Sequence, residues 1–157
     1  MWMHSWSSWY RMRISAAIYF NDAVTNQTVR QDMPEKSPRP TEINLHQKSR
    51  ILEISFDNGN VFKLPYEYLR VYSPSAEVRG HGPGQGVLQV GKEKVSITKI
   101  DPVGSYAIQP HFDDGHDTGI YSWETLYDLG VNHERYWKEY LESLEAAGHK
   151  RMTASTD

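Results

Sequence analysis

The strongest constraint on the fold is a short pattern that occurs twice, Phe56-Asp-Asn-Gly59 and Phe112-Asp-Asp-Gly115. Each copy lies between two short segments rich in apolar residues, which is typical of a tight turn joining two antiparallel strands. Asn58-Gly59 is moreover the preferred pair for a two-residue turn in which both residues have positive φ. The sequence therefore predicts two β-hairpins.

A helix is predicted after each hairpin. Pro65 can open a short helix after the first one, because proline is favoured in the first helical turn. After the second hairpin, Ser122 is a helix cap and Gly130 a helix end. A longer helix is expected between Asn132 and Gly148. The order hairpin then helix thus occurs twice. It indicates either a duplicated strand–turn–strand–helix unit or two ordinary hairpins, since Asp-x-Gly turns are common.

Further short strands are expected around Ile43 and Leu45 and over residues 87–90 and 94–100. Together with the hairpins they predict an α+β fold. In this fold a small, mostly antiparallel sheet is built from two β-hairpins and is packed by two C-terminal helices.

Residues 1–40 differ in composition from the rest of the chain. Residues 1–10 contain three tryptophans without helical or strand periodicity, and residues 33–40 are polar and proline-rich. We expect a flexible or non-native N-terminal extension, with Met33 as a plausible natural start. The remaining units are a domain over residues 41–130, a C-terminal helix over 131–148 and a tail over 149–157.

Composition narrows the functional classes. The chain has no cysteine, which removes thiolate nucleophiles and thiolate-rich zinc sites and is compatible with the cytoplasmic location that we expect. A formal net charge of -3 gives no general attraction to nucleic acid. No run approaches the roughly 18 apolar residues of a membrane-spanning helix. We expect neither a nucleic acid nor a membrane as partner.

The segment from Ser73 to Gln85 has the composition of a functional loop, with serines, a charge pair, a histidine and three glycines. Its serines lack a nucleophile-elbow pattern, so a turn built by side-chain hydrogen bonds is the plainer interpretation. Aromatic residues such as Trp123 could stack a ligand, although aromatics at helical spacing usually belong to a core. The candidate binding residues are Ser73, Ser75, Glu77, Arg79, Gly80, His81, Gly82 and Trp123.

Two other motifs suggest chemistry. The first, residues 86–93, resembles a phosphate-binding P-loop, but Glu93 replaces the hydroxyl residue that holds Mg²⁺, so a hairpin turn is expected at Gly91-Lys92. The second, His111-x-Asp113, has the spacing found in iron sites with two histidines and one carboxylate. The candidate metal ligands, for iron or zinc, are His81, His111, His116 and Asp117, with Asp113 and Asp114 nearby.

Three ordered blocks carry a family resemblance: residues 69–82 (LRVYSPSAEVRGHG), 100–107 (IDPVGSYA) and 114–123 (DGHDTGIYSW). The chain from Pro40 to Gly130 resembles the gamma-butyrobetaine hydroxylase-like N-terminal domain, long catalogued as a bacterial domain of unknown function. Members stand alone, are attached to iron–sulfur carrier ATPases, or precede the oxygenase domain of carnitine-pathway hydroxylases. The region over residues 41–130 is identified as this domain.

The resemblance implies a zinc module with three cysteines and one histidine in the hydroxylases. Those positions fall here at Ser73, Ser75, Val78 and His116, and neither serine nor valine replaces a thiolate toward Zn²⁺. The resemblance also implies that the loop lies beside the second hairpin, with Ser75, His81 and His116 in one neighbourhood. No counterpart of the catalytic iron domain is present.

The sequence thus leads to two functional hypotheses. The first is a non-catalytic binding or adaptor module whose partner is another protein, an iron–sulfur carrier or an oxygenase component; this partner class is implied by the resemblance alone. The alternative is a metal-binding protein or small metalloenzyme that uses the His/Asp cluster.

Overall fold

The computed structural model describes residues 9–12, 37–80 and 86–152. His81 and Gly82 lie outside this part of the chain, as do most of the predicted extension and the last five residues. The strands are β1 (Trp9–Met12), β2 (Pro40–His46), β3 (Ile51–Phe56), β4 (Val61–Pro65), β5 (Ile97–Val103), β6 (Ala107–Phe112) and β7 (Tyr121–Ser122). The helices are α1 (Tyr66–Val71), α2 (Ala76–Arg79), α3 (Trp123–Val131) and α4 (His133–Ala146).

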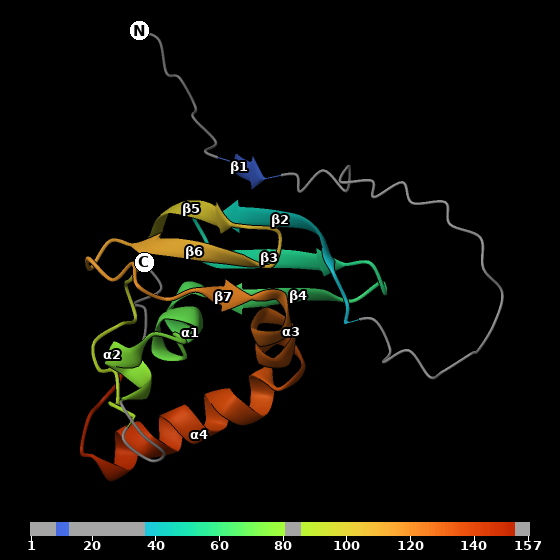
Figure 1. The fold of residues 1–157 in the computed structure, drawn as a ribbon. Coiled ribbons are helices and arrows are strands. Elements are labelled where there is room, and N and C mark those ends of the chain that lie inside the picture. The colour runs from blue at the N-terminus through green and yellow to red at the C-terminus, as the bar shows by residue number, and fades with distance from the viewer. Residues whose placement is uncertain (1–8, 13–36, 81–85, 153–157) are drawn as a thin grey trace, which may run out of the picture.

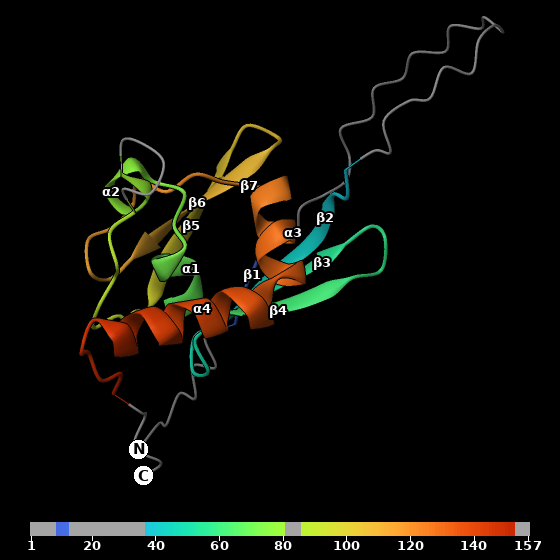
Figure 2. The same cartoon turned by 90° about the horizontal axis from the view of Figure 1, so that it is seen from below.

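The α+β class is confirmed, but the strands form two antiparallel sheets instead of one. Their orders are β1-β2-β3-β4 and β5-β6-β7. The two sheets share one hydrophobic core, in which Ile54 and Leu64 of the first sheet meet Ile97 and Ile108 of the second. Figures 1 and 2 show α1, α3 and α4 together on one side of the sheets, with α2 separated from α3.

Both predicted hairpins exist, although the geometry expected for the first turn is wrong. Only Gly59 has positive φ, at 89°, and the turn is closed by hydrogen bonds from Phe56 N–H to Asn60 O and from Gly59 N–H to Phe56 O. The second turn repeats this arrangement, with Gly115 at 86°. A type I turn followed by a left-handed glycine needs one residue more than the predicted turn. That extra residue places His116 directly after the second turn.

The predicted strand over residues 87–90 is wrong, and the one over 94–100 begins only at Ile97. The backbone of this segment is hydrogen-bonded outside any sheet; for example, the Val87 N–H donates to the Val78 carbonyl. A tight hairpin at Gly104, not predicted from the sequence, joins β5 to β6 instead. The hairpin expected at Gly91-Lys92 is also wrong, although Gly91 does have positive φ, at 70°.

Helix α3 begins as predicted but ends later. Ser122 Oγ accepts the Thr125 N–H and caps the helix. Gly130, expected to end the helix, lies inside it. The glycine is needed for packing instead, because a Cβ there would lie 2.3 Å from Cγ of the Phe62 ring. Asn132 makes no side-chain cap for α4.

The start of the predicted polar tail is anchored to the domain. Arg151 forms a bidentate ion pair with the buried Glu67 on α1, with N···O distances of 2.6 to 3.1 Å. Its guanidinium also lies over the ring of Trp137. The segment that directly follows α4 is therefore anchored to the first helix by Arg151. None of the helices within residues 37–80 and 86–152 is long and apolar enough to cross a membrane.

Candidate functional site

His116 is the centre of a buried polar cluster between the second hairpin and the segment before α2. Its backbone is fixed by the hairpin turn, where its carbonyl accepts the Phe112 N–H and its own N–H donates to Asp114 Oδ1. Its imidazole is only 2 % exposed. A buried imidazole needs hydrogen-bond partners for both nitrogens, and this one has them.

The partners of His116 come from the loop singled out in the sequence. Nε2 lies 2.8 Å from Ser73 Oγ and 3.4 Å from Ser75 Oγ, and Nδ1 lies 3.1 Å from Glu77 Oε2. An ionised carboxylate can only accept, so Nδ1 carries the proton. In the neutral ring Nε2 is then the acceptor, and the Ser73 hydroxyl donates to it.

Burial lowers the pKa of His116, and Arg70 lowers it further, against the opposing effects of Glu77 and Asp114. The neutral tautomer is therefore favoured. Gly119 permits the close packing around this ring, because a Cβ at that position would lie 2.4 Å from Ser73 Oγ.

A charged network fixes the same region from the other side. Asp114 Oδ2 accepts from Arg70 Nε at 2.9 Å and from Lys92 Nζ at 2.6 Å, and Arg70 also reaches Gln89. Burial opposes ionisation of Asp114, but the hydrogen bonds from Lys92, the His116 N–H and Arg70 outweigh it and lower its pKa to about 2. Lys92, the lysine of the P-loop-like run, thus forms an ion pair with a carboxylate of the protein.

The series Glu77–His116–Ser73 has the connectivity of a hydrolase triad, but its exposure is reversed. In a triad the acid is buried and the serine faces the substrate. Here Ser73 is 1 % exposed, whereas the Glu77 side chain is 65 % exposed. The Ser73 hydroxyl is also engaged with His116 Nε2, although Ser73 borders the adjacent cavity.

The predicted metal ligands do not come together as one group. His111 faces away into a separate set, with Nε2 2.8 Å from Asp101 Oδ2 and Nδ1 3.8 Å from Asp117 Oδ2. The hydrogen bonds from Lys99 and His111 lower the pKa of Asp101. Among the described residues, no three His, Asp or Glu side chains are arranged to hold a metal ion. His81, the fourth predicted ligand, lies outside these residues.

The other candidate loop residues have separate roles. Gly80 ends α2 with φ of 72°. Arg79 is exposed and forms no ion pair with a carboxylate in the described part of the chain. Trp123 begins α3, and its Nε1–H donates to the Ser105 carbonyl, so this ring fixes the β5–β6 turn and takes no part in the cluster.

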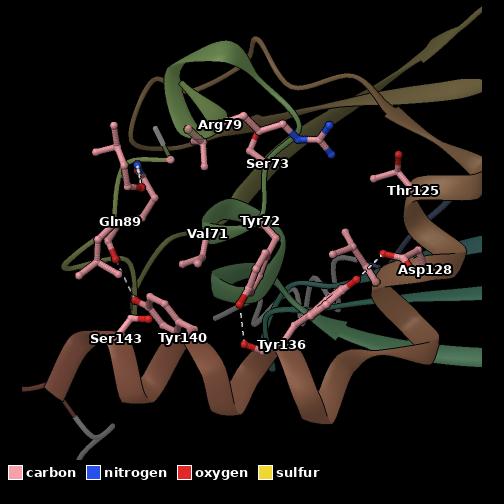
Figure 3. Close-up of a pocket in the computed structure, with 15 residues that line it drawn as sticks. Val71, Tyr72, Ser73, Arg79, Gln89, Thr125, Asp128, Tyr136, Tyr140 and Ser143 are labelled. Carbon is pink, nitrogen blue, oxygen red and sulfur yellow. Dashed lines mark hydrogen bonds between the residues drawn. The ribbon is translucent and has the colours of Figure 1, made fainter. Parts of the chain in front are cut away.

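A cavity of about 540 Å³ lies next to the cluster and shares Ser73 with it. It is open to solvent and is lined by the end of α1, α2, the segment 86–89, α3 and α4 (Figure 3). Sequence reasoning did not find this cavity, because its walls come from five segments separated along the chain. Three tyrosines form part of its wall, Tyr72, Tyr136 and Tyr140.

Comparison with known proteins agrees with this architecture. The family model for the gamma-butyrobetaine hydroxylase-like N-terminal domain matches residues 43–127, more than half of the chain. The chain belongs to this family. The family resemblance seen in the sequence is thereby confirmed.

Solved structures of similar proteins support the same assignment. One NMR solution structure is 49% identical, with 84% of this chain and 98% of that chain covered and a TM-score of 0.64. A second is 40% identical, with 77% and 97% covered and a TM-score of 0.65. A crystal structure of a DUF971-family protein of unknown function from Acidithiobacillus ferrooxidans is 40% identical, with 59% and 92% covered and a TM-score of 0.50. No curated protein matches the chain significantly.

In this member of the gamma-butyrobetaine hydroxylase-like family, two of the three positions for which the resemblance implies cysteines lie against His116. Ser73 and Ser75 contact His116, and the adjacent Val78 is buried. The predicted proximity of Ser75 and His116 is thus confirmed. Glu77, on the exposed side of the ring, completes a hydrogen-bonded cluster that contains no thiolate.

Proposed function

We propose that this protein is a non-catalytic binding module that docks onto another protein in the cytoplasm. The partner class that the family suggests is an iron–sulfur carrier or an oxygenase component. The proposal is supported by the reversed exposure of the Glu77–His116–Ser73 series, in which the serine is buried and the carboxylate is the exposed member, the opposite of a hydrolase triad.

The segment 86–90 offers a surface for such docking. It leaves Val87 and Val90 exposed at 56 % and 40 %, next to the cavity rim. Its position is set by Arg70 through Gln89 and by Val87 N–H on Val78 O, so the apolar side chains are presented on an ordered backbone. Preorganisation of this kind reduces the entropy lost on association.

The test uses purified proteins. The chain is mixed with an iron–sulfur carrier ATPase, or with an oxygenase component, and complex formation is followed by calorimetry and size exclusion with light scattering. We expect a defined complex with one of them, weakened about tenfold or more by Val87→Asp/Val90→Asp, because charges are depleted from interface cores. Val61→Asp is the matched control, since Val61 is 54 % exposed on β4.

Two outcomes would contradict the proposal. Absence of a complex with either class of protein would remove the docking role. A complex weakened equally by Val61→Asp would move the docking surface away from segment 86–90.

A metal-binding function is the second candidate; the described residues hold no ready-made group of three ligands for it, so it would need His111 with its neighbouring carboxylates to rearrange or to recruit a further ligand. This imidazole is flanked by the carboxylates of Asp101 and Asp117 at 2.8 and 3.8 Å. Carboxylate and imidazole suit iron or zinc. Metal analysis of wild type and His111→Ala tests this candidate, which predicts a bound metal that is lost in the variant.

A further inference from the structure

The cavity beside the His116 cluster has the size of a small-molecule site. Its volume of about 540 Å³ lies within the usual range for ligand pockets, roughly 300 to 1,000 Å³. Figure 3 shows the side chains of Val71, Tyr72 and Tyr136 directed into the space between the loop segments and α4. The cavity is thus a site formed by side chains as well as a gap between elements.

Most polar groups on the cavity wall are already engaged within the protein. The hydroxyls of Tyr72 and Tyr140 donate to the carbonyls of Tyr136 and Gln89. Ser143 Oγ donates to a carbonyl on its own helix. The Tyr72 and Tyr136 rings stack with centroids 5.4 Å apart. The wall therefore offers ring faces and methyl groups, which suit an apolar ligand body.

Arg79 is the charged group left open at this site. It lines the cavity, is exposed and has no carboxylate partner among the described residues. In Figure 3 its guanidinium extends toward Thr125 and Asp128 across the cavity. Asp128, in contrast, accepts hydrogen bonds on both oxygens, from Asn132 and Tyr136. A planar guanidinium with free donors is suited to a bidentate anion.

From these observations we propose that the cavity binds a small organic monocarboxylate whose aliphatic or aromatic body packs against Tyr72 and Tyr136 and whose carboxylate pairs with Arg79. A singly charged head group fits better than a phosphate dianion, because the Asp128 carboxylate also lines the cavity and repels the second negative charge. This inference goes beyond the docking role and does not depend on it, since it concerns the isolated chain.

Octanoate is a suitable probe, followed by amide chemical shifts of the full ¹⁵N-labelled chain. We expect saturable shifts at residues 71–79, 86–89 and 136–143, with a dissociation constant on the order of 1 mM or tighter. Arg79→Gln should weaken binding about tenfold, the scale of a hydrogen bond to a charged group. Lys138→Gln is the matched control, because Lys138 lies on α4, is 78 % exposed and does not line the cavity.

One neutral analogue and one analogue with a different anionic head group complete the test. Octan-1-ol should bind more weakly than octanoate and should be insensitive to Arg79→Gln, while octyl phosphate should bind less tightly than octanoate. The inference is overturned if octanoate causes no saturable shifts at the cavity, if Lys138→Gln weakens it as much as Arg79→Gln, or if octyl phosphate is preferred.

Discussion

At the scale of single residues, the hydrogen-bonded cluster depends on the protonation state of His116. The neutral ring satisfies both its nitrogens, by donating to Glu77 and accepting from Ser73. A second proton on Nε2 would remove that acceptor and would place a charge in a nearly closed site. The cluster therefore favours the neutral imidazole over the protonated one.

This predicts a specific pH dependence of stability. The pKa of folded His116 is lowered from its ordinary 6.5 by burial and by Arg70. Between the folded and the ordinary pKa the unfolded chain binds more protons, so the free energy of unfolding falls as the pH decreases below about 6.5. Asp114, with a pKa lowered to about 2, has the same sign, but its contribution is lost only below about 4.

Urea unfolding at several pH values measures this effect. In His116→Gln the loss of stability between pH 7 and pH 5 should be smaller than in the wild type. It should not vanish, because burial also lowers the pKa of His133. An unchanged slope in His116→Gln would show that the ring does not titrate as described.

At the scale of secondary-structure elements, α3 gives the clearest case of packing overriding propensity. Gly130→Ala in the middle of an exposed helix would normally stabilise a protein by about 0.5 to 1 kcal/mol. Here the new Cβ would meet Cγ of the Phe62 ring at 2.3 Å. We expect Gly130→Ala to lower the free energy of unfolding by about 1 to 3 kcal/mol, the usual cost of overpacking.

A double-mutant cycle with Phe62→Leu tests the cause. The smaller side chain should recover part of the loss caused by Gly130→Ala, giving a favourable coupling between the two substitutions. If the two changes are simply additive, or if Gly130→Ala is stabilising, the close packing of α3 on β4 is contradicted.

The comparison of these elements with the sequence shows what local patterns can predict. The hairpins, the Ser122 cap and the order of strands and helices follow from local signals such as Asp-x-Gly and the capping serine. The end of α3 at Val131 does not, because it depends on a contact between Gly130 and a residue on another element. The strand expected over 87–90 failed for a related reason, since no strand of the described residues pairs with it.

At the scale of the whole molecule, the chain after α4 is part of the folded domain. Arg151 reaches back to Glu67, which is 5 % exposed on α1. Removal of one partner leaves a buried charge without compensation. The pKa of Arg151 is raised mainly by its hydrogen bonds to Glu67.

Arg151→Ala should therefore destabilise the protein by about 1 to 3 kcal/mol, below the full cost of breaking a buried pair because Arg151 is itself partly exposed. Thermal or urea unfolding measures the change, with Lys150→Ala as the exposed neighbouring control. Glu67→Gln in the Arg151→Ala background should recover stability. Equal effects of Arg151→Ala and Lys150→Ala would show that the anchor contributes nothing.

The site itself was only partly predictable at this scale. The family resemblance placed Ser75 beside His116, and the structure confirms it. Glu77 as the partner of Nδ1 was out of reach, because a turn of α2 and a hairpin far along the chain must be folded before the two meet. The cavity beside Ser73 is likewise a product of the tertiary fold and has no local sequence signal.

The central claim is that the cluster around His116 is a closed, hydrogen-bonded structural element of a non-catalytic binding module. Metal analysis of untagged protein, purified without chelators and compared with a His116→Ala variant, tests it most directly. We expect less than about one tenth of an equivalent of iron or zinc in the folded wild-type protein, because serine hydroxyls do not replace thiolates toward these ions. A stoichiometric metal that is lost in His116→Ala would contradict it.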